Sequence, residues 1–140
     1  MRNPIRSAVA IPLLSAGMLL ALSGTATADT ASLYAPSALT LTVAEGDSAA
    51  TTTPQRAVTL SCRPTDGGTH PAPADACTEL RTVQGDFSAL KGSGPIVCPM
   101  VYDPVVVTAQ GVWEGRRVDF ERTYSNSCVL AAEGTSVFDF

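Results

Sequence analysis

Val105-Val106-Val107-Thr108-Ala109 is the stretch of this sequence from which the fold class follows. Its β-branched side chains favour a strand, because they pack well on a pleated, half-buried surface. Residues 117–124 then alternate between bulky, mostly apolar side chains and polar ones. This period of two is typical of a strand with one buried face. The two segments together predict an antiparallel hairpin.

Further strands are predicted on both sides of this hairpin. Residues 39–43 and 57–62 alternate in the same way, and the apolar side chains of residues 136–140 predict a last strand. Residues 63–73 contain prolines and glycines with little apolar bulk, and therefore predict a loop.

One helix is predicted over residues 74–84, where apolar side chains recur at helical spacing. Asp75 is expected to cap its start, and Gly85 to end it. A short second piece over residues 86–90 is expected to turn two side chains inward, Phe87 and Leu90. A helix among several strands predicts an α+β domain with an antiparallel sheet.

The first 28 residues have the organisation of a secretory signal peptide. Arg2 and Arg6 precede an almost wholly apolar run over residues 7–22, and a small-x-small pattern ends at Ala28. The alternative is a membrane anchor, but the run is shorter than the roughly 20 residues that a span needs. We therefore expect a signal peptide over 1–28 and one domain over 29–140, which makes the protein secreted and extracellular, with no membrane association.

Composition and motifs narrow the class of function. The chain has 140 residues, of which 45% are hydrophobic and 16% charged, and this balance suits one packed domain. The net charge is −4 and no basic cluster exists beyond Arg116-Arg117, which argues against a nucleic-acid partner. His70 is the single histidine, and no Gly-x-Ser-x-Gly, phosphate-loop or dinucleotide motif occurs. We therefore expect a binding protein and no enzyme.

The four cysteines become informative once export is predicted. They are Cys62, Cys77, Cys98 and Cys128. An oxidising compartment favours two disulfides, and four cysteines allow three pairings between which the spacing does not choose. Zinc is the alternative, but there is no Cys-x-x-Cys and one histidine. We expect two disulfides, no metal and no cofactor.

Residues 97–104, Val-Cys-Pro-Met-Val-Tyr-Asp-Pro, are the stretch most indicative of function. Two prolines within six residues argue against a buried strand, and the apolar side chains argue against an ordinary exposed loop. Because proline holds the chain extended, we expect a stiff, exposed segment with Met100 at its centre, the alternative for Met100 being core packing. Proteases bind substrates as extended strands. The segment thus predicts protease binding, with a non-inhibitory secreted binding module as the alternative.

Several motifs along the chain resemble the Streptomyces-type subtilisin inhibitors. In chain order they are Leu33-Tyr34-Ala35-Pro36-Ser37-Ala38-Leu39, Gly68-Thr69-His70-Pro71-Ala72-Pro73, Cys98-Pro99-Met100-Val101-Tyr102-Asp103-Pro104, Gly111-Val112-Trp113, Tyr124-Ser125-Asn126 and Ser136-Val137-Phe138. The resemblance covers nearly all of residues 29–140 and includes all four cysteines. It implies a tight-binding inhibitor of subtilisin-like serine proteases.

The resemblance also implies a site and an architecture. The scissile bond would join Met100, as P1, to Val101. The remaining positions of the protease-binding loop, P4 to P2 and P2′ onward, would be Val97, Cys98, Pro99, Tyr102, Asp103 and Pro104. The implied bridges are Cys62–Cys77 and Cys98–Cys128. An antiparallel sheet of about five strands, two short helices and a homodimer are implied as well.

Four other side chains carry separate expectations. Asn126, two residues before Cys128, is expected to donate its amide to a carbonyl of the loop, the alternative being an ordinary turn residue. Tyr102 either contacts the protease or packs on the body of the inhibitor. Trp113 is expected in the core, and His70 in a loop without a catalytic role.

Overall fold

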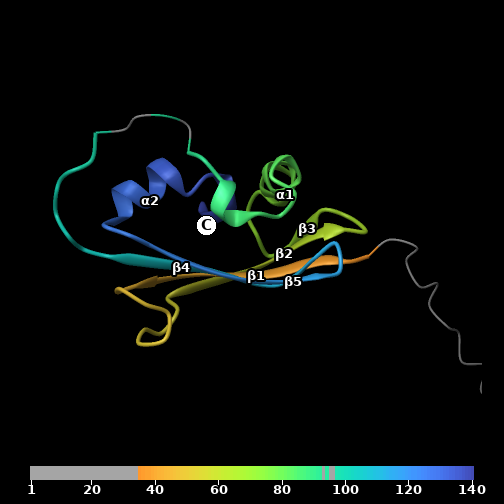
Figure 1. The fold of residues 1–140 in the computed structure, drawn as a ribbon, viewed down its shortest axis with the longest axis horizontal. Coiled ribbons are helices and arrows are strands. Elements are labelled where there is room, and N and C mark those ends of the chain that lie inside the picture. The colour runs from red at the N-terminus through yellow and green to blue at the C-terminus, as the bar shows by residue number, and fades with distance from the viewer. Residues whose placement is uncertain (1–34, 93, 95–96) are drawn as a thin grey trace, which may run out of the picture. The chain divides into compact units, whose positions relative to one another are not determined.

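The computed structural model describes residues 35–92, 94 and 97–140, which form one α+β unit (Figure 1). The signal peptide predicted over residues 1–28 lies outside the described residues. The described elements, with η for a 3-10 helix, are β1 (Ser37–Glu45), β2 (Arg56–Arg63), β3 (Gly67–Gly68), α1 (Pro73–Thr82), η1 (Phe87–Ala89), β4 (Val105–Trp113), β5 (Arg116–Tyr124), α2 (Ser127–Glu133) and η2 (Ser136–Phe138).

The strands form one five-stranded antiparallel sheet in the order β3-β2-β1-β4-β5. The predicted hairpin is confirmed, with Val105 opposite Tyr124 and Trp113 opposite Arg116. Its turn, Glu114-Gly115, has two positive φ angles, the two-residue geometry that matches the twist of paired strands. The α+β class and the antiparallel sheet are therefore as expected.

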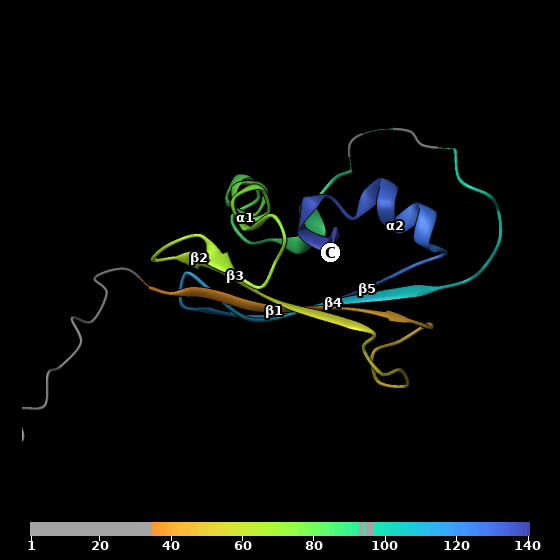
Figure 2. The same cartoon turned by 180° about the vertical axis from the view of Figure 1, so that it is seen from behind.

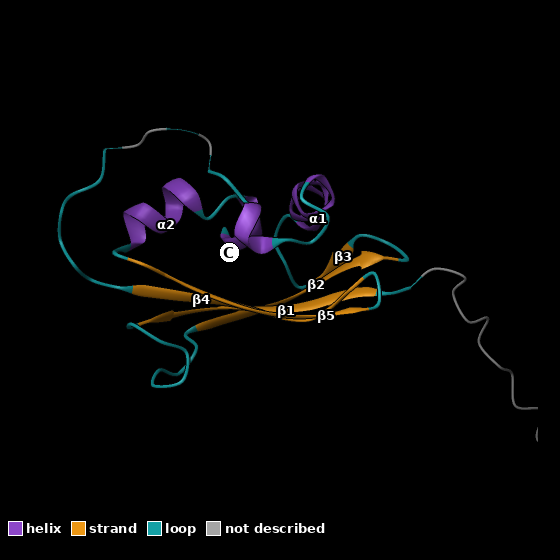
Figure 3. Cartoon of the chain, viewed as in Figure 1, coloured by secondary structure: helices purple, strands orange, loops and turns teal. Residues whose placement is uncertain are grey.

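The helices all lie on one face of the sheet, and the core fills the space between (Figure 3). Its fully buried side chains come from β1, β2, β4, α1 and the C-terminal residues: Leu41, Leu60, Val107, Leu80 and Val137. Trp113 is buried beside them, and so are Phe87 and Leu90 of the short piece after α1. Among the described residues, none of the helices has the length and hydropathy of a bilayer-spanning segment.

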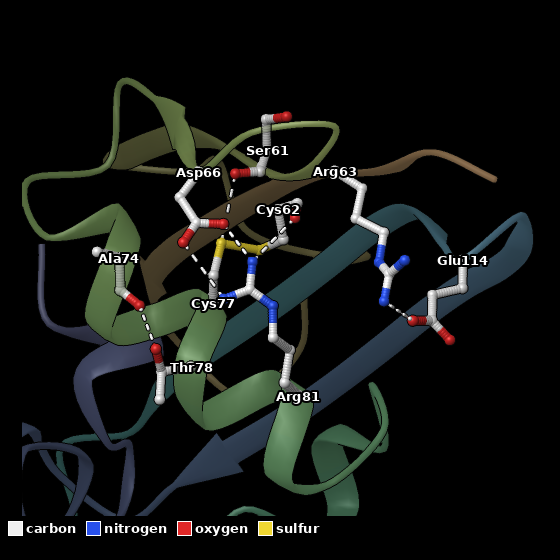
Figure 4. Close-up of polar contacts among 9 residues, drawn as sticks. All are labelled: Ser61, Cys62, Arg63, Asp66, Ala74, Cys77, Thr78, Arg81 and Glu114. Carbon is white, nitrogen blue, oxygen red and sulfur yellow. Dashed lines mark hydrogen bonds and ion pairs between the residues drawn. A yellow bond between two sulfur atoms is a disulfide. The ribbon is translucent and has the colours of Figure 1, made fainter. Parts of the chain in front are cut away.

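The Cys62–Cys77 disulfide joins β2 to α1 inside this core, and both cysteines are buried (Figure 4). Arg81, one turn further along α1, donates to the Cys62 carbonyl at 3.0 Å and pairs with Asp66 in the preceding loop. These contacts fix α1 at the opposite end of the sheet from residues 97–104, as both views of the chain show (Figures 1 and 2).

The expected cap of α1 is wrong. The helix begins at Pro73, whose fixed φ suits a first helical position, and Ala72 before it offers no side-chain cap. Asp75 lies in the first turn instead, where its charge is favoured by the positive end of the helix dipole. Gly85 follows the helix with φ 76°, and its N–H donates to the Leu80 carbonyl at 2.9 Å.

The predicted strand over residues 136–140 is also wrong. Ser136–Phe138 form the single turn η2, and the Thr135 hydroxyl accepts the N–H of Val137. Val137 and Phe138 are adjacent and both pack into the core, which this turn allows without pairing to a strand of the sheet.

The loop predicted over residues 63–73 contains the short strand β3. Gly68 lies opposite Leu60, and a Cβ at this position would come within 2.2 Å of the Thr59 carbonyl oxygen. Only glycine therefore allows the chain to pair so closely with β2.

His70, in the loop before α1, is buried and doubly hydrogen-bonded. Its Nδ1 accepts the Ala72 N–H at 3.0 Å, so Nε2 carries the proton and donates to the Val137 carbonyl at 3.2 Å. The ring also lies edge-on to Phe140, with centroids 5.6 Å apart. His70 thus ties the C-terminal residues to this loop.

The other face of the sheet carries no helix (Figure 2). Along the central strands β1 and β4, its side chains are small or uncharged: Ala38, Thr40, Thr42, Thr108, Gln110 and Val112. The β1–β2 connection, residues 46–55, folds against the sheet at the end nearest residues 97–104, where the Thr123 hydroxyl donates to the Asp47 carbonyl at 2.8 Å. We call the surface formed by Ala38, Thr40, Thr42, Thr108, Gln110 and Val112 the open sheet face.

Candidate functional site

Residues 97–104, which we call the exposed segment, form a long connection into β4 (Figure 1). Met100 is fully exposed at 105% of its reference area, which excludes the core-packing alternative. Three more apolar side chains of the segment are exposed large hydrophobics, namely Val97, Val101 and Tyr102. Contiguous apolar surface of this kind marks a place where another molecule binds.

The Cys98–Cys128 disulfide fixes the N-terminal part of the exposed segment. Its Cα atoms lie 5.7 Å apart across a sequence separation of 30 residues. Cys128 belongs to the first turn of α2, so the segment is bonded to a helix that lies on the sheet. This pairing, together with Cys62–Cys77, is one of the three that spacing alone leaves open and the one that the resemblance implies.

Asn126 holds the middle of the exposed segment with both ends of its amide. Its Oδ1 caps α2 by accepting the Val129 N–H at 3.0 Å. Its Nδ2 donates to the carbonyls of Pro99 and Val101, at 3.1 and 2.9 Å. These carbonyls belong to the residues on either side of Met100. Asn126, which is buried at 7% exposure, therefore orients the backbone around the exposed Met100.

Main-chain hydrogen bonds fix the C-terminal part of the exposed segment. The Asp103 N–H donates to the Ser125 carbonyl at 2.9 Å, and the Pro104 carbonyl accepts the Gly46 N–H at 2.7 Å. β4 begins at the next residue, Val105. The segment is therefore anchored to the body of the protein before, within and after Met100.

Sequence reasoning did not identify the β1–β2 connection as part of this site. The Gly46 N–H donates a hydrogen bond to the Pro104 carbonyl, and the Asp47 carboxylate accepts a hydrogen bond from the Tyr102 hydroxyl. The ring of Tyr102 stays 69% exposed, so Tyr102 both touches the body and offers its surface to solvent. No pattern in the sequence predicts this approach, because the partners are 55 residues apart and the contact is polar and exposed.

This arrangement is suited to binding another polypeptide. The exposed segment has no regular secondary structure, so the backbone groups that the contacts above do not use are available to another chain. Within the part of the chain that the structure describes, no three histidine, cysteine, aspartate or glutamate side chains are grouped to hold a metal ion. The chemistry offered is an accessible Met100–Val101 peptide bond in a backbone held in one shape.

Comparison with known proteins gives the family. The model described as "Subtilisin inhibitor-like" matches residues 35–126. The chain is 63% identical over 110 residues to "Subtilisin inhibitor-like protein 4" of Streptomyces lavendulae, which covers 79% of this chain and 95% of that one. It is 54% identical over 144 residues to "Trypsin inhibitor STI2" of Streptomyces longisporus, over 100% of both chains.

A solved structure has the same fold. Sermetstatin of Streptomyces caespitosus, crystallised in complex with Bacillus licheniformis subtilisin, matches with a TM-score of 0.69 and 46% sequence identity. The match covers 75% of this chain and 99% of that one. With a family model over most of the described residues and relatives that align along nearly their whole length, the chain belongs to the subtilisin inhibitor-like family, whose members inhibit proteases and are not enzymes.

Proposed function

We propose that this protein is a secreted inhibitor of subtilisin-like serine proteases that offers Met100–Val101 as the scissile bond. The observation that carries the proposal is the full exposure of Met100 in a segment that is anchored on both sides. In this proposal residues 1–28 direct export, and the mass of the exported protein, starting at Asp29, tests that part.

Each residue of the exposed segment has a position in the proposed complex. Met100 is P1, because its unbranched, polarisable side chain fills an elongated apolar pocket. Val101 is P1′, and the segment lies along the protease cleft as an extended strand bound by main-chain hydrogen bonds. The other positions, P4 to P2 and P2′ to P3′, are Val97, Cys98, Pro99, Tyr102 and Asp103, followed by Pro104.

Preorganisation explains why such a segment inhibits and is not digested. Fixing the backbone of a flexible substrate costs about 1–2 kcal/mol per residue, and this cost is largely met in advance when the segment is already held in shape. After the protease serine attacks the Met100 carbonyl carbon, the Val101 amine leaves but stays close, because contacts on both sides hold the two ends. Re-formation of the bond then competes with hydrolysis.

Titration of subtilisin with the exported protein tests this function. Stoichiometric loss of activity supports inhibition, and mass spectrometry after long incubation should find a single cut after Met100. A protein that leaves subtilisin fully active would instead be the alternative, a secreted binding module that uses the same exposed segment.

Substitutions of Asn126 separate its two roles, which are capping α2 and holding the exposed segment. Asn126→Asp keeps the oxygen that caps α2 but replaces the amide donor beside two carbonyls with an acceptor. Asn126→Ala loses both, and the lost cap alone costs about 0.5–2 kcal/mol. We expect subtilisin to cleave both variants about 10-fold faster than the wild type, with only the alanine variant losing the cap contribution to stability.

The measurements for Asn126 are cleavage by mass spectrometry and thermal unfolding. If the aspartate variant resists cleavage as long as the wild type does, the amide bonds to Pro99 and Val101 contribute nothing to inhibition.

We also propose that the protein forms a homodimer through the open sheet face. This face carries no charge on its central strands, and charged residues are depleted at the centres of protein interfaces. It also lies on the side of the sheet opposite the helices, so pairing there leaves the exposed segment accessible (Figures 1 and 2).

Val112→Arg tests the dimer. Val112 is half-buried on the open sheet face, opposite Ala38 of β1, so a second copy would bury the new charge without a partner. We expect analytical ultracentrifugation to find a dimer for the wild type and a monomer for the variant, with subtilisin inhibition unchanged. A wild type that sediments as a monomer at micromolar concentration would contradict the proposal.

A further inference from the structure

The β1–β2 connection reaches the exposed segment at Tyr102. The Tyr102 hydroxyl donates a hydrogen bond to Oδ1 of Asp47. Both residues are exposed, so the bond is not a by-product of core packing. It joins a loop outside the exposed segment to the residue that the proposed function places at P2′.

Asp47 itself is held in place from several directions. Its carbonyl accepts a hydrogen bond from the hydroxyl of Thr123 in β5, at 2.8 Å. The neighbouring Gly46 donates its N–H to the Pro104 carbonyl at 2.7 Å, and Ala49 donates its N–H to Glu121 at 3.0 Å. The carboxylate is therefore presented to Tyr102 from a backbone docked on both the sheet and the exposed segment.

The conformation of this connection depends on a glycine. Gly46 has φ 132°, in the region that favours glycine, and a Cβ there would lie 2.3 Å from the Thr52 side chain. The turn that carries Asp47 beside Tyr102 is thus fixed locally as well as by its contacts.

We propose that Asp47 is a positioning residue for protease binding, which sets the direction of the Tyr102 side chain before a protease arrives. The proposal rests on the proposed function, since it assigns the bond to the primed side of the scissile peptide. An exposed tyrosine without this bond samples several rotamers and loses that freedom on binding. With the bond, the ring is already confined, so affinity is gained without a new contact to the enzyme.

The same contact has a signature in the free protein. The hydrogen bond to Asp47 raises the pKa of Tyr102 above its ordinary value, with smaller contributions from desolvation and from the negative charge of the carboxylate. Ionised Tyr102 has no proton to donate and faces a carboxylate of the same sign. Tyrosine titration followed by ultraviolet absorbance therefore reports the contact without any protease.

The test is a double-mutant cycle measured as inhibition constants for subtilisin. The variants are Asp47→Ala, Tyr102→Phe and the pair together. Confining one side chain in advance corresponds to about 3- to 10-fold in affinity, so each single variant should weaken inhibition by that factor. The double variant should be no weaker than the weaker single one, because both changes remove the same bond.

Two further variants separate positioning from a general effect on the fold or the charge. Asp47→Asn keeps an oxygen that accepts the Tyr102 proton and should inhibit within about 2-fold of the wild type. Asp75→Asn removes an exposed carboxylate from α1, at the other end of the sheet, and should change neither inhibition nor tyrosine titration. The ionisation of Tyr102 should shift to lower pH in Asp47→Ala, while the temperature of unfolding stays the same.

Three results would overturn the inference: inhibition by Asp47→Ala equal to the wild type, losses that multiply in the double variant, or a tyrosine titration that Asp47→Ala leaves unchanged. Each is measured against a wild type that inhibits subtilisin. A wild type that does not inhibit at all would instead refute the proposed function, which separates the two failures.

Discussion

A Met100→Gly variant is expected to inhibit subtilisin about 30- to 1,000-fold more weakly than the wild type. The Met100 side chain is fully exposed in the free protein, so all the apolar surface that a protease pocket covers is buried only on binding. Burying a methionine side chain contributes about 1.5–3 kcal/mol, and the added backbone freedom of glycine costs about 0.5–1 kcal/mol more. The inhibition constant for subtilisin measures this loss directly.

Met100→Lys is the matched variant that changes specificity. The S1 pocket of trypsin holds a carboxylate, and a charge-assisted hydrogen bond to it contributes about 1.5–3 kcal/mol. We therefore expect trypsin inhibition to improve about 10- to 100-fold. The 54% identity with a protein named as a trypsin inhibitor indicates that a closely similar chain supports such an activity.

The control for both variants is their stability. Because Met100 is not buried in its own chain, Met100→Lys should unfold at the temperature of the wild type, and Met100→Gly only slightly below it, as expected from the extra backbone freedom of glycine. If both inhibit subtilisin as the wild type does, Met100 is not the P1 residue and the assignment of the whole segment changes.

Opening the Cys98–Cys128 bridge is expected to turn the inhibitor into a substrate. The two cysteines lie on opposite sides of the Met100–Val101 bond, so the bridge joins the two halves of a cut chain. Tethered groups meet at effective concentrations of about millimolar or higher, which favours re-formation of the bond over loss of the C-terminal half. A Cys98→Ser/Cys128→Ser variant should be hydrolysed at least about 10-fold faster, as measured by mass spectrometry over time.

The Cys62–Cys77 bridge provides the control. Its cysteines are both on the N-terminal side of the proposed scissile bond, so it cannot hold the two halves together. The loop-entropy model gives both bridges a similar contribution to stability, about 3–4 kcal/mol each. At a temperature where both double-serine variants are folded, only the one lacking Cys98–Cys128 should be hydrolysed quickly; equal resistance would contradict the clamp.

The larger strands could be predicted from the sequence for two reasons. β1, β2 and β5 bury one face and show the period of two that such burial imposes. β4 is buried on both faces over residues 105–109 and was predicted from its run of β-branched side chains. The shorter elements show no such pattern in the sequence. β3 is a pair of glycines without side chains, and η2 is a single turn whose adjacent Val137 and Phe138 are both in the core.

The site was predictable in part for a related reason. Prolines and apolar side chains together suit neither a buried strand nor an ordinary loop, which identified residues 97–104. No helix was predicted over residues 127–133, because α2 is a seven-residue helix with half-buried positions and no strong helical pattern. The contacts of Asn126 and Asp47 depend on how distant parts of the fold meet, and local sequence does not encode such meetings.

The freedom of the Met100 side chain has an evolutionary consequence. Disulfides, hydrogen bonds and the sheet set the shape of the backbone around it, whereas its own atoms make no demand on that shape. Selection for stable folding and selection for the target protease can then act on different codons. The methionine codon ATG lies one nucleotide change from codons for lysine, arginine, leucine, valine and threonine. With Met100 as the proposed P1 residue, single mutations would therefore change the target enzyme without destabilising the fold.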